Sequence, residues 1–84
     1  MAHTDIELDR FVKKVHDYFI VNRFCKPDDK NFWIENLYES KISLRAIGCV
    51  VGSDKKMMFF DYVYFENTNK TRVSLYTHEK TITF

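Results

Sequence analysis

The chain has 84 residues, 45% of them hydrophobic and 30% charged, with a formal net charge of +1. This length makes a single domain, residues 1–84, and the plentiful apolar and charged residues exclude a disordered or low-complexity chain. The near-neutral charge argues against a dedicated duplex-DNA binder, which carries a strong basic footprint. No secretory signal and no apolar run of about 20 residues, the length of a membrane span, is visible. We therefore expect a cytoplasmic protein with reduced thiols and no membrane contact.

The first predicted element is a helix over residues 4–22. Thr4-Asp5-Ile6-Glu7 has the form of a capping box, in which Thr4 and Glu7 each accept a backbone N–H from the other. The apolar face is formed by residues that recur at helical spacing: Leu8, Phe11, Val12, Val15 and Phe19. Charged residues occupy the opposite face: Asp9, Arg10, Lys13, Lys14 and Asp17.

Residues 29–39 are ambiguous after the break around Pro27. Asp28 or Asp29 is a suitable N-cap for a second, short helix. We favour this helix over the alternative, a strand through Phe32–Ile34. Its inward side chains would be Phe32, Trp33, Leu37 and Tyr38.

From Lys41 the apolar period changes to two, which predicts strands. The turns are Gly52-Ser53-Asp54 and Asn67-Thr68-Asn69-Lys70, since Asn tolerates the left-handed region. Strands are expected from Lys41 to the first turn, from Met57 to Glu66, from Thr71 to Thr77 and, briefly, from Thr81 to Phe84. Because the turns are short, the strands form an antiparallel meander.

The strand from Met57 to Phe65 is the most informative segment, because eight of its nine residues are apolar or aromatic and the only charge is Asp61. One side is formed by Met58, Phe60, Tyr62 and Tyr64, and the other by Met57, Phe59, Val63 and Phe65. A helix with one apolar stripe covers one sheet face only, so the second face is expected to be a contact surface. The predicted fold is therefore α+β, with an N-terminal helix, plus a short second helix, packed on a three- to four-stranded antiparallel sheet.

No motif of catalysis or metal binding is present. His3, His16 and His78 have no neighbour at metal or catalytic spacing, which predicts solvated or capping roles. Cys25 and Cys49 lack the paired ligands of a zinc site, and a lone cysteine is usually a small apolar filler. Phosphate loops, nucleophile elbows and paired catalytic carboxylates are missing too. We therefore expect no enzyme, no cofactor, no metal and no small-molecule substrate.

The second face of the aromatic strand predicts a protein-binding site at Phe59, Asp61 and Val63, with Arg45 and Arg72 beside them. Asp61 is expected to pair with Arg45 or Arg72, or alternatively with a cation of a partner. Self-association into a homodimer is also expected from an apolar face on a nearly neutral chain. These features favour a non-enzymatic protein that masks or inhibits a partner protein. Residues with AT-rich codons predominate, which indicates an AT-rich genome such as that of a bacteriophage or a low-GC bacterium. The small size, this coding and the surplus aromatic surface together fit an inhibitor, antitoxin or anti-defence factor of a phage or mobile element.

Two other functions remain open at this stage. Aromatic residues on a sheet face beside lysines are also used for single-stranded RNA. The residues that would serve this RNA-binding or regulatory alternative are Lys55, Lys56, Tyr62, Tyr64, Lys13 and Lys14. A structural component of a virion is the third function considered.

Overall fold

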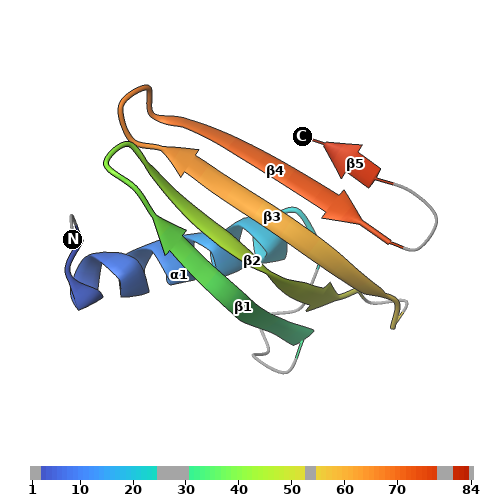
Figure 1. Ribbon diagram of the computed structural model, residues 1–84. Coiled ribbons are helices and arrows are strands. Elements are labelled where there is room, and N and C mark those ends of the chain that lie inside the picture. The colour runs from blue at the N-terminus through green and yellow to red at the C-terminus, as the bar shows by residue number, and fades with distance from the viewer. Residues whose placement is uncertain (1–2, 25–30, 53–54, 78–80, 84) are drawn as a thin grey trace.

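The computed structural model describes residues 3–24, 31–52, 55–77 and 81–83, the last segment by its backbone only. It contains one helix and five strands: α1 (Asp5–Val21), β1 (Phe32–Glu39), β2 (Ser43–Val51), β3 (Met57–Phe65), β4 (Lys70–Tyr76) and β5 (Thr81–Thr83). The strands form one antiparallel sheet in the order β1-β2-β3-β4-β5, and α1 crosses one face of it (Figure 1). The predicted α+β class, with an N-terminal helix on an antiparallel meander, is confirmed.

The predicted capping box begins α1. The Glu7 N–H donates to Thr4 Oγ1 at 3.2 Å, and the Thr4 N–H donates to Glu7 Oε1 at 3.4 Å. These reciprocal bonds satisfy two backbone donors that the first turn of a helix leaves without intrahelical partners. The sequence therefore fixes where this helix begins.

The C-terminal end of α1 is a Schellman motif, a helix ending closed by one residue in the left-handed region. Arg23 takes that place with φ 62°. The Arg23 N–H donates to the Ile20 carbonyl at 3.0 Å, and the Phe24 N–H donates to the Phe19 carbonyl at 2.8 Å. The Phe19 and Phe24 rings lie 6.2 Å apart, the apolar contact that accompanies this motif.

The core lies between α1 and the facing side of the sheet. Helix residues Phe11, Val15 and Phe19 are buried there, as the helical spacing predicts. Phe60 is fully buried in the middle of β3, with its ring 4.7 Å from that of Phe19 and 5.5 Å from that of Phe32. The other buried sheet residues of this core are Leu44, Ala46, Val50, Tyr62, Val73 and Leu75.

The predicted second helix is wrong, because Phe32–Glu39 is strand β1 and pairs with β2. A bulge between Ile34 and Asn36 shifts the pairing register by one residue. The bulge places Phe32 and Leu37 opposite Val50 and Ala46, two residues on the buried side of β2. Because of the bulge, Phe32 and Leu37 lie on the same face although they are an odd number of residues apart. This spacing breaks the two-residue period of a strand and resembles the spacing of a helix. The sheet accordingly gains a strand, and α1 is the only helix among the described residues.

His3, expected to be solvated or to cap a helix, is instead 7% exposed and joins three segments of the chain. Its Nδ1 lies 2.6 Å from Glu39 Oε2, at the end of β1. Its Nε2 lies 2.7 Å from Glu66 Oε1, just after β3. The hydrogen bond to Glu66 is the largest cause of a raised His3 pKa, the bond to Glu39 adds to it, and desolvation of the ring opposes both.

Candidate functional site

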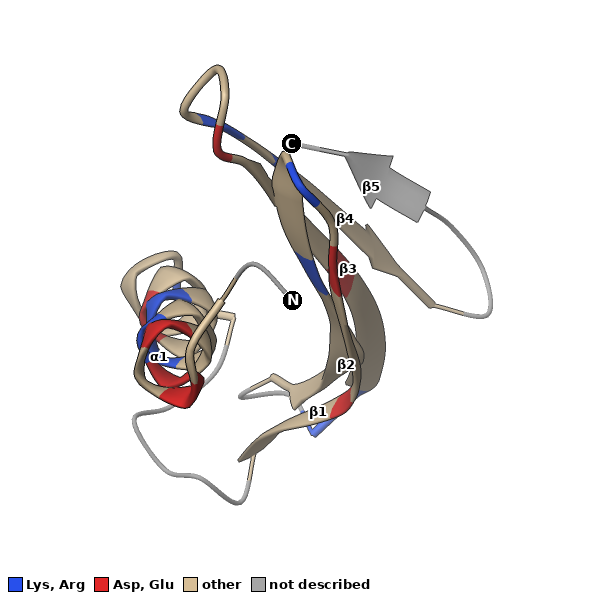
Figure 2. Cartoon of the chain, turned by 60° about the vertical axis from the view of Figure 1, so that its left-hand side comes forward, with Lys and Arg blue, Asp and Glu red and all other residues tan. Residues whose placement is uncertain are grey.

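The sheet face that points away from α1, called here the open face, carries the candidate site. Side chains alternate along a strand, so the residues of β3 that flank the buried Phe60 and Tyr62 point to the open face. In Figure 2 the helix lies on one side of the curved sheet, and no described element covers the other side. The residues of this face with large side chains include Trp33, Tyr38, Arg45, Ile47, Met57, Phe59, Asp61, Val63, Phe65, Lys70, Arg72 and Tyr76.

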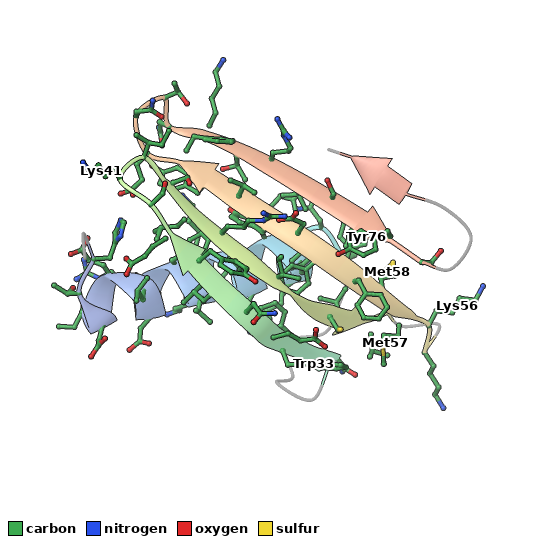
Figure 3. All side chains as sticks on the ribbon, in the orientation of Figure 1. Trp33, Lys41, Lys56, Met57, Met58 and Tyr76 are labelled. Carbon is green, nitrogen blue, oxygen red and sulfur yellow. The ribbon has the colours of Figure 1, made fainter. Side chains whose placement is uncertain are left out.

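One end of the open face is aromatic. Trp33, Cys49, Phe59 and Tyr76 are consecutive partners across β1, β2, β3 and β4, and we call these four residues the aromatic row. The Phe59 and Tyr76 rings stack with centroids 6.0 Å apart. Trp33 is 38% exposed, and Met57, two residues before Phe59 on β3, is 50% exposed. Figure 3 shows Trp33, Met57 and Tyr76 toward the same end of the sheet.

Cys49 lies within the aromatic row but is inaccessible. The residue is 1% exposed, and its thiol donates to Glu35 Oε1 at 3.6 Å. Burial, with a smaller contribution from the Glu35 charge, raises the pKa of the thiol to about 11. A protonated, buried thiol is a poor nucleophile, so Cys49 is a filler of the sheet, as its isolation in the sequence predicts. Cys25 and His78 lie outside the described residues.

The other end of the open face is a charged depression of about 340 Å³. Arg45 Nε and Nη2 donate to the two carboxylate oxygens of Asp61 at 2.9 and 2.6 Å. This bidentate bond raises the pKa of Arg45 and confirms the predicted pairing of Asp61 with a neighbouring arginine. The depression is lined by Ser43, Arg45, Asp61, Val63, Phe65, Arg72 and Ser74.

All five residues predicted to bind a partner protein share the open face. Arg45, Asp61, Val63 and Arg72 line the depression, and Phe59 belongs to the aromatic row. Other members of the face, among them Trp33, Tyr38, Ile47 and Tyr76, were not predicted from the sequence. Trp33 was expected to point inward from a helix, and its exposure follows from the strand at residues 32–39.

The residues of the nucleic-acid alternative do not form one exposed surface. The Tyr62 ring is buried under α1, where it meets the Phe11 ring edge-on at 5.8 Å, and it has no surface for stacking on a base. The Lys14 ammonium lies 4.1 Å from the centroid of the Tyr64 ring and covers it. Lys55 and Lys56 precede β3, at the end of the strand away from Tyr64, and Lys13 is exposed on α1.

No cluster of three or more His, Cys, Asp or Glu residues in the described segments could hold a metal ion. The only helix described is also neither long nor apolar enough to span a membrane. No protein-family model, curated protein or solved structure matches this chain. The open face is therefore the feature from which a function must be inferred.

Proposed function

We propose that this chain is a non-enzymatic binding protein that masks a surface of a partner protein with its open face. The observation that carries the proposal is the continuous surface formed by the aromatic row and the charged depression, with no described element covering it. Large uncovered patches with apolar side chains usually mark contacts. Aromatic residues and arginine are also the residue types enriched at protein interfaces.

The two parts of the face have complementary tasks in such a contact. Trp33 and the stacked rings of Phe59 and Tyr76 offer apolar area on a rigid sheet, so little side-chain freedom is lost on binding. The Arg45–Asp61 ion pair holds two charged groups in fixed positions beside these rings. A partner is then discriminated by whether its own charges complement them. A rigid, preformed surface of this kind suits masking of a partner, as in an inhibitor, antitoxin or anti-defence factor of a phage or mobile element.

The same surface supports self-association. Two copies of a face with apolar side chains and both signs of charge are able to pair about a two-fold axis. In this proposal the free protein is a homodimer in which the aromatic rows of two copies meet and the depression stays accessible, and the partner protein competes for the aromatic row.

Affinity capture from the source cells tests the proposal. Tagged wild type is compared with Phe59→Ser and Asp61→Arg, with Lys13→Glu on the exposed side of α1 as the matched control. Asp61→Arg leaves Arg45 without its carboxylate and sets three arginines around Val63. We expect both open-face variants to lose the captured protein, and the control to retain it after nuclease treatment.

Two results would contradict masking through this face. One is capture of the same protein by folded Phe59→Ser and Asp61→Arg, judged folded by unchanged helical circular dichroism. The other is capture that nuclease removes and that falls steeply with salt, which is the behaviour of phosphate contacts and favours the RNA-binding alternative.

A further inference from the structure

We infer that the depression beside Arg72 is a carboxylate subsite, which receives an aspartate or glutamate side chain of the partner protein. The inference rests on the proposed function and specifies the chemistry of the partner. The charges in the depression, its hydrogen-bonding groups and its surroundings all fit such a side chain.

The charges around the depression do not balance. Arg45 already holds both oxygens of the only carboxylate in the lining, Asp61. Arg72 lies across Val63 from Arg45, is exposed, and has no ion pair with any described residue. Lys70, opposite Phe65 on the same face, adds a second exposed cation. The lining therefore holds two arginines and one carboxylate, and Lys70 lies beside it. The excess positive charge attracts an anion.

The groups in the depression match a carboxylate on a short apolar stem. A guanidinium presents parallel N–H donors that fit the two oxygens of a carboxylate. Ser74 is on the same strand as Arg72, and its hydroxyl is a further donor at the wall of the depression. Val63 and Phe65 provide apolar surface for the methylene groups of an acidic side chain.

The surroundings favour a protein carboxylate over a nucleic-acid phosphate. A phosphate backbone needs a succession of cations along its path. Beyond Asp61 the open face instead continues into the aromatic row, with Phe59 and Tyr76 stacked on each other. An apolar contact with an acidic residue beside it is the composition of a protein surface.

The test uses a probe that does not depend on knowing the partner. N-acetylglutamate N-methylamide carries one carboxylate on a glutamate side chain, and N-acetylglutamine N-methylamide is its neutral isostere. Each is titrated into ¹⁵N-labelled protein at constant ionic strength, and the Arg72 Nε–H and the Ser74 amide are followed by NMR. We expect saturable shifts with the glutamate probe only, at concentrations on the order of millimolar. Arg72→Gln should weaken this binding by about fivefold or more, whereas Arg10→Gln, on exposed α1 surface, should leave it unchanged.

The inference is overturned if both probes give equal shifts, if neither saturates, or if Arg72→Gln keeps the wild-type response. It is also overturned in favour of a phosphate site if inorganic phosphate binds more tightly than the glutamate probe at equal charge. Because no partner is present in the titration, its outcome is independent of the capture experiment. A probe that fails to bind, together with capture that depends on Phe59, would reject the subsite and leave the proposed function standing.

Discussion

His3 Nε2 lies 2.7 Å from Glu66 Oε1, although the two residues are 63 positions apart in the chain. Its other ring nitrogen lies 2.6 Å from Glu39 Oε2. A carboxylate is only an acceptor, so both ring nitrogens must donate, and the imidazolium is the form that satisfies both contacts. The segment before α1 is thus bonded to the ends of β1 and β3 by a group that titrates near neutrality.

The His3 contacts predict a pH dependence of stability. The folded-state pKa is raised above 6.5, so the stabilisation is complete below pH 6.5 and is lost as the pH rises through the folded-state value. We expect the difference in unfolding free energy between wild type and His3→Gln to be larger at about pH 6 than at about pH 9. Urea denaturation at the two pH values measures it. An equal difference at the two pH values would show that the charge of His3 does not stabilise the fold.

Glu66→Gln provides the control for that prediction. It replaces the carboxylate whose hydrogen bond contributes most to the raised pKa with a neutral amide. NMR titration of the His3 ring should then give a lower pKa than in wild type. An unchanged ring pKa would contradict the bonding described here.

Gly48→Ala should be strongly destabilising. Neither described glycine has a positive φ, so the restriction at Gly48 is one of space. A Cβ there would meet the Trp33 carbonyl oxygen, and it would lie 2.9 Å from both Ile34 Cα and Phe60 Cζ. Overpacking against backbone costs about 1–3 kcal/mol or more. The decrease in unfolding free energy should exceed that of Gly52→Ala, in the turn after β2, and equal decreases would contradict the close approach of β1.

Arg23→Gly should stabilise the protein. Arg23 has φ 62°, a conformation that costs a non-glycine residue about 1 kcal/mol. Glycine removes this strain, although the gain is reduced by its greater freedom in the unfolded chain. Thermal denaturation should show a higher midpoint for Arg23→Gly and a lower one for Asn22→Gly, since Asn22 has φ −85°. A lower midpoint for Arg23→Gly would show that the side chain has another stabilising role.

The free protein is expected to self-associate through the open face. Sedimentation at about 10–100 μM, where modest apolar interfaces become populated, should give a mass above that of the monomer. Phe59→Ser should shift the distribution to monomer, whereas Lys13→Glu should not. A wild-type monomer across this range would rule out the homodimer.

The elements with an uninterrupted local pattern could be predicted from the sequence. The capping box and the apolar stripe locate α1, and the alternation along β3 separates Phe60 from Phe59 and Asp61. The shared face of Phe59, Asp61 and Val63 followed from that alternation. In each case the residues that carry the signal are neighbours in the chain.

The parts that could not be predicted depend on contacts between distant segments. In β1 the extra residue in the bulge interrupts the alternation of apolar and polar residues that marks a strand. Residues 32–39 form a strand because they pair with β2. The exposure of Trp33 depends on the same pairing. The contacts of His3 with Glu39 and Glu66 join positions that no local pattern connects.

The sheet order β1-β2-β3-β4-β5 has a consequence for how the chain folds. Every ladder joins strands that are consecutive in the sequence, so the contact order of the sheet is low. Hairpins between neighbouring strands close within about 1–10 μs, and none of them requires a distant segment. Docking of α1, with His3 reaching Glu39 and Glu66, is the long-range event. We therefore expect the meander to form first, and the arrival of the N-terminal helix to set the folding rate.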